Sequence, residues 1–288
     1  MSIGQLKISV ITPSYNQARF LEETICSVLE QRYPKLEYII IDGGSNDGSL
    51  AIIERYAAAL THWVSEADNG QADAINKGFS RATGDVLCWL NSDDTYAPGV
   101  LREVAEYFDA HPDVDVVSGR CRLWYGDQRD RLMAPSPLRD YGDFLRIGSN
   151  WTKGRLIVQP EAFLRRSAFE ATRGLREDLH YCLDSCLWMD MARVGCRFDS
   201  VDRHWANLRM HPGQKTADLS PAYAELAATA WQHLLQDWPR FGDNAREIAD
   251  DIFGALMDVR GADRRAFERV RGSTSYRVGR WLTRCRFW

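Results

Sequence analysis

Short apolar runs rich in Val and Ile alternate with segments of helical periodicity through the first 120 residues of the chain. Five runs predict buried strands because they are short and continuous: residues 7–12, 36–41, 61–66, 85–90 and 114–119. Helical patterns lie between them; in the first, Leu21, Ile25 and Val28 fall on one face. This repeated alternation predicts an α/β fold with a mostly parallel sheet flanked by helices.

The pattern is less regular between residues 120 and 215. Residues 155–160 predict a further strand, and residues 184–194 predict a helix. From Pro221 onward the sequence is helical in two long segments. We therefore predict a first domain over residues 1–215 and a helical C-terminal extension over residues 216–288.

Composition narrows the class of protein. The chain has 288 residues, of which 45% are hydrophobic and 26% charged, and this excludes a disordered or low-complexity protein. No apolar run approaches the roughly 20 residues that span a bilayer, and the start lacks the basic and apolar regions of a signal peptide. Seven scattered cysteines predict reduced thiols and a cytoplasmic location.

The formal net charge of −4 hides an asymmetry. Residues 260–288 hold nine Arg and two acids, a net charge of +7, so the remaining 259 residues carry −11. Arginines mixed with Trp and Leu are typical of a helix on an anionic lipid surface, which predicts peripheral binding to a membrane. A basic helix packed on the acidic body is the alternative, and both stay open. The acidic body argues against a nucleic-acid partner.

Polar segments follow three of the predicted strands where those strands end. They are residues 12–16 (TPSYN), 42–49 (DGGSNDGS) and 91–94 (NSDD). Because ligands of open parallel sheets bind at the carboxyl ends of the strands, we expect these segments to line one crevice. The sequence contains neither of the two common glycine-rich phosphate-binding motifs.

Two adjacent acids, Asp93 and Asp94, follow a very apolar strand. Carboxylate oxygens at such a strand end suit Mg²⁺ or Mn²⁺, and these ions usually also bind phosphate oxygens of a substrate. A simple turn is the alternative, since Asn-Ser-Asp-Asp is good turn chemistry.

Four blocks occur in an order and spacing that resemble family 2 glycosyltransferases: ISVITPSYN, IIIDGGSNDGS, SEADNGQADAINKGF and GDVLCWLNSDD. The resemblance is close over residues 7–118 and looser as far as His211. It implies a GT-A-type, Rossmann-like sheet and a divalent metal cofactor, Mg²⁺ or Mn²⁺. It also implies an inverting transferase that moves a sugar from a nucleotide-diphosphate sugar to an acceptor hydroxyl. The expected partners are a glycan or lipid-linked acceptor, in surface polysaccharide or glycolipid synthesis on the inner face of the plasma membrane.

The resemblance further implies roles for individual residues. The residues expected to contact the nucleotide sugar are Thr12, Pro13, Tyr15, Asp42, Asp73, Lys77 and Asp93. Among them, Asp42 is expected on the base and Asp93 toward the ribose, whereas Asp94 and His211 are expected to hold the metal. Plain structural alternatives remain: Asp42 also suits the start of a turn, and Lys77 also suits a solvated helix face. Many relatives carry Arg where this chain has Ile75.

Asp184 is the catalytic base that the resemblance implies. It lies in LDSCLW (183–188), which resembles a segment that opens a helix on the acceptor side, although Leu replaces the Glu that often precedes the Asp. On a helix, Asp184 shares a face with Trp188. A helix cap is the alternative role, and it is compatible with a base. Asp178 and Asp190 are nearby rivals.

Two other functions stay open at this point. A nucleotidyltransferase can share the sheet and the acids, but its first loop usually carries Gly and Lys or Arg, which TPSYNQ lacks. A sugar-nucleotide-binding subunit without turnover is the other alternative, and an assay of donor turnover distinguishes it from an enzyme.

Overall fold

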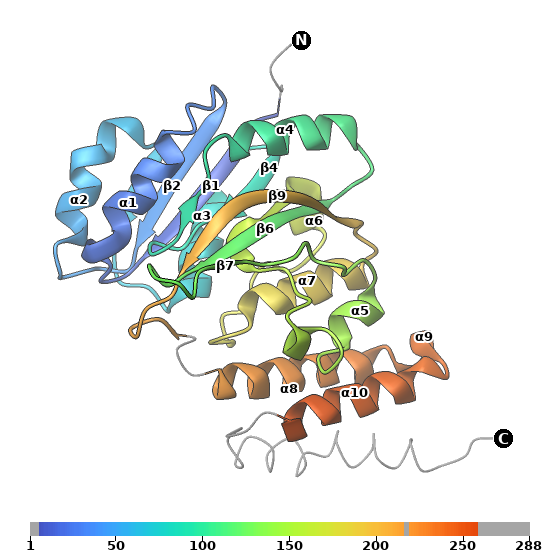
Figure 1. Ribbon diagram of the computed structural model, residues 1–288. Helices are drawn as coiled ribbons and strands as arrows, with labels where there is room; N and C mark the ends of the chain where they lie inside the picture. Colours follow the sequence, from blue (N-terminus) through green and yellow to red (C-terminus); the bar gives the residue numbers. More distant parts are fainter. Residues whose placement is uncertain (1–5, 216–218, 259–288) are drawn as a thin grey trace.

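The computed structural model describes residues 6–215 and 219–258, which surround one curled sheet (Figure 1). The strands are β1 (Ile8–Ser14), β2 (Leu36–Asp42), β3 (His62–Ser65), β4 (Val86–Trp89), β5 (Thr95–Tyr96), β6 (Val116–Trp124), β7 (Arg131–Leu132), β8 (Ala162–Arg165) and β9 (Phe198–Arg209). The helices are α1 (Ala18–Leu29), α2 (Ser49–Tyr56), α3 (Gln71–Arg81), α4 (Val100–Ala110), α5 (Tyr141–Leu145), α6 (Arg166–Glu170), α7 (Leu183–Arg193), α8 (Ser220–Gln236), α9 (Trp238–Phe241) and α10 (Asn244–Asp258).

The sheet has a parallel half and a mixed half. Its strand order is β3-β2-β1-β4-β8-β6-β9-β5, with β7 paired to β6. The strands from β3 to β4 are all parallel to their neighbours. β8 lies antiparallel between β4 and β6, whereas β6 and β9 are parallel. The parallel half contains the strands that carry the N-terminal motifs, and their carboxyl ends therefore meet at one edge.

The parallel strands β1, β2 and β4 are buried on both faces, which explains why their apolar runs are continuous rather than alternating. On β2, Ile39 and Ile41 pack into a core with α3, α5 and α7, whereas Tyr38 and Ile40 pack into a second core with α1, α2 and α4. The side chains therefore follow the two-residue period of a strand although both sets are apolar.

The C-terminal helices pack on the first of these cores. Leu226 and Trp231 of α8 and Ile248 of α10 belong to the same buried cluster as Ile11 of β1. Figure 1 shows α8 and α10 as a layer beneath α5 and α7. The predicted domain boundary falls on residues 216–218, outside the described residues, and the core continues across it.

One sequence prediction about the second half of the sheet is wrong, and one strand was missed. Residues 155–160 form no strand: Gln159–Glu161 is a short 3₁₀ turn, and the strand β8 follows it. Pro160 lacks the N–H that a central strand would donate, and it suits the start of a helical turn. The sequence analysis also missed β9, whose burial follows no clean two-residue period.

Within residues 6–215 and 219–258, none of the helices combines the length and the apolar character that crossing a bilayer requires. The basic tail, residues 260–288, lies outside the described residues, so the expectation that it binds lipid is untested.

Candidate active site

A tight turn after β4 carries the two adjacent acids. The Asp94 N–H donates to the Asn91 carbonyl at 3.0 Å and closes the turn. The next strand, β5, pairs antiparallel with β9, and this pairing carries the end of β9 to the turn. The backbone N–H of Arg209 donates to Asp94 Oδ1 at 3.0 Å, which joins segments 115 positions apart. The NSDD motif and the segment containing His211 therefore form one unit.

Asp93 and His211 form a pair that suits a divalent ion. His211 Nε2 lies 3.0 Å from Asp93 Oδ2, and the side chains are 13% and 18% exposed, respectively, so a ligand can reach them. The His211 ring packs against Phe20, with the ring centroids 4.7 Å apart, which fixes its orientation. Neighbouring ligands of a six-coordinate ion with bonds of about 2.1 Å lie about 3 Å apart. The donor atoms present therefore fit such an ion.

Asp94 occupies a different environment. Its side chain has no exposed surface, and Oδ1 accepts the Arg209 N–H. Burial, reinforced by the neighbouring Asp93 carboxylate, raises the pKa of Asp94 well above its usual value. The acid beside His211 is Asp93, so Asp93 becomes the candidate ligand, and the predicted metal role of Asp94 stays a prediction.

Arg209 holds the turn in place, a role that the sequence analysis missed. Its Nε donates to the Asp93 carbonyl at 3.0 Å, and Nη2 lies 2.5 Å from Glu23 Oε2. The guanidinium also lies over the rings of Phe20 and Trp124, at 4.9 and 4.1 Å from the ring centroids. An Arg two positions before a candidate ligand is the signal that could have identified it.

The segment after β1 presents Tyr15 to solvent. Tyr15 is 62% exposed, so its ring is available to stack on a nucleoside base. Thr12 is fully buried, and its hydroxyl lies 3.1 Å from the Tyr38 hydroxyl. Pro13 is a buried residue of β1, paired with Ile41. Tyr15 is therefore the exposed residue of the three, and the predicted contacts of Thr12, Pro13 and Tyr15 with the nucleoside stay predictions.

Asp42 organises the loop after β2. Its Oδ2 accepts the N–H groups of Gly44 and Ser45 at 3.2 and 2.9 Å and the Ser65 hydroxyl at 2.7 Å. Its Oδ1 accepts the Ser45 hydroxyl at 2.6 Å. Asp42 is fully buried, and these bonds occupy most of the acceptor sites of a carboxylate. The turn alternative therefore describes Asp42 in this structure, and its predicted contact with the base stays a prediction.

Asp68 is a further candidate site residue, which the sequence analysis did not single out. A side chain on Gly43 would come within 2.6 Å of Asp68 Oδ2, so the glycine allows this carboxylate to lie across the end of β2. Asp68 also accepts the Gly70 N–H at 2.9 Å. It follows β3 closely, so the strand-end argument that identified the other segments could have identified it too.

Asp73 and Lys77 pair with each other at the start of α3. Lys77 Nζ lies 3.2 Å from Asp73 Oδ2, and that oxygen accepts the Asn69 N–H at 2.9 Å. The Asn69 hydrogen bond, together with the weaker effect of the Lys77 ion pair, lowers the pKa of Asp73 against the opposing effect of burial. Lys77 also faces Glu66. The two residues hold the loop before α3, and their predicted contact with the nucleotide stays a prediction.

Asp184 lies in the first turn of α7 and does not cap it. The residue before the helix is Cys182, whose side chain makes no capping hydrogen bond. Asp184 Oδ1 accepts the N–H and the hydroxyl of Ser185, at 2.7 and 3.1 Å. Burial raises the pKa of Asp184 to about 6, and the Ser185 bonds only partly offset this. A carboxylate with this pKa is ionised at neutral pH and is basic enough to accept a proton.

Two tryptophans connect the base candidate to the paired acids. Trp188, one turn after Asp184 and on the same face of α7, stacks on Trp89 with the ring centroids 5.8 Å apart and the planes at 23°. Trp89 is the last residue of β4, and only Leu90 separates it from the NSDD turn. Both rings are buried. The stack therefore joins the middle of α7 to the end of β4.

A chain of polar contacts crosses the same region. Lys215 Nζ lies 3.1 Å from Gln71 Oε1 and 3.3 Å from the His180 carbonyl. Gln71 Nε2 donates to Asn91 Oδ1 at 2.8 Å, and Asn91 Nδ2 donates to Gln159 Oε1 at 3.1 Å. These contacts link α3, the NSDD turn and the segment that precedes α7. The Asn91 amide is the group in the NSDD turn that takes part in this chain of hydrogen bonds.

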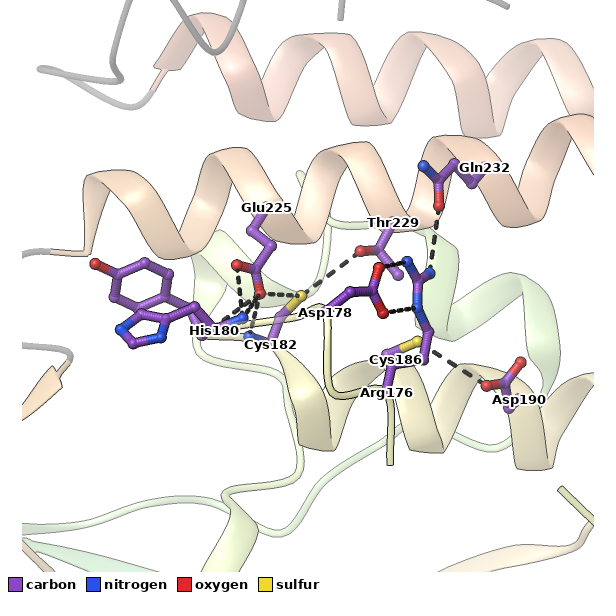
Figure 2. A network of polar contacts seen from close by, with 10 residues as sticks. Arg176, Asp178, His180, Cys182, Cys186, Asp190, Glu225, Thr229 and Gln232 are labelled. Atoms are coloured by element: carbon purple, nitrogen blue, oxygen red, sulfur yellow. Dashed lines mark hydrogen bonds and ion pairs between the residues drawn. The ribbon is translucent and has the colours of Figure 1, made fainter. Parts of the chain in front are cut away.

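The rivals of Asp184 have other partners. Figure 2 shows Asp178 paired with Arg176, at 2.5 Å. Asp190 faces Cys186 and lies 3.7 Å from His233 Nε2 of α8.

Cys186, Asp190 and His233 place ligand-type atoms within 4.8 Å of one another. Arg176 faces both Cys186 and His233, and its positive charge opposes a cation there. Asp93 and His211 are therefore the better metal candidate.

Comparison with known proteins finds similarity to glycosyltransferases. The family model "Glycosyl transferase family 2" matches residues 9–173. An uncharacterized glycosyltransferase of Mycobacterium tuberculosis is 36% identical over 226 residues, which cover 74% of this chain and 81% of that protein.

Two solved structures share the fold. The structure of Staphylococcus aureus TarS 1–349 in complex with UDP-GlcNAc superposes with a TM-score of 0.69 at 18% identity, covering 92% of this chain and 80% of that chain. The mannosyltransferase PcManGT from Pyrobaculum calidifontis, in complex with GDP-Man and Mn²⁺, gives a TM-score of 0.58 at 21% identity, covering 96% and 83%. A longer TarS structure extends beyond the match, which covers 44% of that chain.

Proposed function

Since this chain belongs to glycosyl transferase family 2, we propose that it moves a sugar from a nucleoside-diphosphate donor to an acceptor hydroxyl, with inversion at the anomeric carbon. The chain is a glycosyltransferase with a fold of the GT-A type. The solved neighbours carry UDP-GlcNAc or GDP-Man, which supports this class of donor. The nucleotidyltransferase alternative does not agree with the family.

The observation that supports the proposal is a contact between the two elements that carry the candidate groups. Asp93 and His211, 3.0 Å apart, lie at the end of β4. Asp184 opens α7, and the Trp89–Trp188 stack joins the two elements. Inversion in a single displacement needs a base on one side of the sugar and a stabilised leaving group on the other.

In this mechanism, Asp184 accepts the proton of the acceptor hydroxyl as that oxygen attacks the anomeric carbon. The nucleoside diphosphate leaves from the opposite face of the sugar. Asp93 and His211 would hold the metal, and Tyr15 would stack on the base of the nucleotide. When bound, a divalent ion supplies positive charge that neutralises the leaving diphosphate. An imidazole ligand is unusual in the oxygen shell of Mg²⁺, so we favour Mn²⁺, the ion present in the PcManGT complex.

For the acceptor we propose a growing glycan or a lipid-linked sugar in surface-polymer synthesis. TarS, which is 31% identical over 111 residues covering 37% of this chain, is named a poly(ribitol-phosphate) beta-N-acetylglucosaminyltransferase. The nine arginines of residues 260–288 support docking on anionic lipid, with the enzyme in the cytoplasm at the inner face of the plasma membrane.

The donor is identified most directly by a binding screen. A panel of UDP-, GDP- and dTDP-sugars is added to the protein with Mn²⁺ or with EDTA, and the melting temperature is measured. One donor should raise the melting temperature in Mn²⁺ and have little effect in EDTA, because binding to the folded state stabilises it. That donor is then tested for transfer to acceptor and for hydrolysis. Binding without either reaction would favour the non-catalytic alternative.

The pH profile of the reaction should reflect Asp184. Because burial raises the pKa of this group to about 6, kcat/KM should be level above that pH. It should fall about tenfold per pH unit below it, as the base becomes protonated. Initial rates between pH 4.5 and 8 measure this. A profile that stays level down to pH 4.5 would exclude a base with this raised pKa.

A further inference from the structure

One carboxylate of the C-terminal extension binds the backbone just before α7. Figure 2 shows Glu225 of α8 facing the segment His180–Cys182. Glu225 Oε1 accepts the N–H groups of His180, Tyr181 and Cys182 at 3.0, 2.8 and 3.0 Å. Its Oε2 lies 3.0 Å from the same His180 nitrogen. Three consecutive amides therefore converge on one side chain that lies more than 40 positions away along the chain.

Of these amides, that of Cys182 belongs to the start of α7, where N–H groups lack partners within the helix, and those of His180 and Tyr181 immediately precede it. Cys182 precedes α7, and its side chain provides no cap. The negative charge of Glu225 also lies at the positive end of the helix dipole. Burial would raise the pKa of Glu225, but the three amide bonds outweigh it and lower the pKa below its usual value. Glu225 is therefore ionised, and it caps α7 from a different segment of the chain.

The opposite side of the same peptide is held as well. Lys215 Nζ contacts the His180 carbonyl at 3.3 Å and Gln71 Oε1 of α3 at 3.1 Å. Glu225 binds the N–H of Tyr181, which belongs to the same peptide as that carbonyl, and the Lys215 ammonium also faces the Glu225 carboxylate. The segment before α7 is thus fixed between α8 and α3, with one charged group on each side.

The packing of α8 does not depend on this charge. Its apolar residues Leu226, Ala227, Ala230 and Trp231 are all buried in the main core and hold the helix in place. The half-buried Glu225 carboxylate does not add to the burial of these apolar side chains. Hydrogen bonds that it accepts from backbone amides are directional, and they fix the position of the backbone that donates them.

We propose that Glu225 is a positioning residue for Asp184, so that the C-terminal extension contributes to the reaction without touching the substrate. Asp184 follows Cys182 by two residues, and the three amides set the direction in which α7 begins. This inference rests on the proposed function, in which Asp184 is the base. A base displaced by about 1 Å loses on the order of 100-fold in rate, whereas the donor, bound at the ends of β1 and β4, is not affected.

The test compares Glu225→Gln and Glu225→Ala with Gln232→Ala. Gln232 lies on α8 and accepts a bond from Arg176 of the same loop, but it does not reach the three amides. Glu225→Gln keeps the size of the side chain and one acceptor oxygen, so it remains informative if the Ala variant does not fold. We expect kcat to fall about 10-fold for Gln and about 100-fold for Ala, with the donor KM within about twofold of wild type. Gln232→Ala should keep wild-type kcat.

A structural role alone would not change the pH profile. Glu225 and the Cys182 thiol both face Asp184. Removing the Glu225 charge should lower the pKa of Asp184 and move the acid limb of kcat/KM below pH 6. Wild-type kcat and an unmoved acid limb in Glu225→Gln would overturn the proposal, as would an equal loss in Gln232→Ala.

Failure of this inference is distinguishable from failure of the proposed function. If only the positioning role is wrong, the wild-type protein transfers sugar, Asp184→Asn is inactive and the Glu225 variants are active. If the proposed function is wrong, the wild-type protein transfers sugar from no donor, or Asp184→Asn retains full activity.

Discussion

Replacing Asp184 with Asn should lower kcat by about 100-fold or more, because the amide cannot accept the proton of the acceptor hydroxyl. The side chain keeps its size, and its carbonyl oxygen can still accept the Ser185 N–H, so the start of α7 should stay intact. The donor KM should remain within about twofold of wild type, since the base acts only in the transition state. Initial rates over a range of donor concentrations, together with a thermal melt, measure both effects.

The matched control for this variant is Asp190→Asn. Asp190 is an acid on the same helix, but its neighbours are Cys186 and His233 rather than the Asp184 side of α7. The control should keep activity near the wild-type level. Wild-type turnover in Asp184→Asn would remove Asp184 from the mechanism, and a large loss in Asp190→Asn instead would assign the base to that rival.

Neutralising the two neighbouring acids one at a time should give opposite results. Asp93→Asn should lower kcat/KM by about 100-fold or more and weaken the response to Mn²⁺, because it removes an anionic ligand of the ion. Asp94→Asn should keep the Mn²⁺ response, because Asp94 is fully buried and bonded to the Arg209 N–H. Its amide would face the Asn91 amide, and we expect a loss of about 1–3 kcal/mol in the free energy of unfolding.

Activity measured against Mn²⁺ concentration, and denaturant unfolding of each variant, separate these effects. The account predicts a raised half-saturating Mn²⁺ concentration for Asp93→Asn and lower stability for Asp94→Asn. If Asp94→Asn loses the Mn²⁺ response and Asp93→Asn retains it, the revised assignment of the metal ligand is wrong.

The parallel half of the fold could be predicted from sequence because its strands are buried on both faces, which leaves long apolar runs between polar turns. The mixed half could not. β9 mixes exposed and buried positions without a period, since it lies between β5 and β6 where only part of its length is covered. The strand predicted at residues 155–160 does not form, because Pro160 lies in a 3₁₀ turn. The strand β8 follows this turn immediately.

The candidate site was predictable as a set of segments but not as a set of contacts. The strand-end rule located Tyr15, Asp42 and the NSDD turn. It could not predict that the Asp42 carboxylate accepts hydrogen bonds from its own loop. The pairing of His211 with Asp93 depends on the β5–β9 ladder, which joins segments more than 100 positions apart. No local pattern in the sequence contains that information.

The central claim is that Asp93 with His211 and Asp184 lie on two sides of a single sugar-binding site. Crystals of the protein grown with Mn²⁺ and a non-hydrolysable nucleotide sugar, measured at a wavelength where Mn²⁺ scatters anomalously, test it directly. The account predicts an anomalous peak bonded to Asp93 and His211, with the anomeric carbon of the sugar facing the Asp184 carboxylate. A peak elsewhere, or a sugar whose anomeric carbon faces away from Asp184, would contradict it.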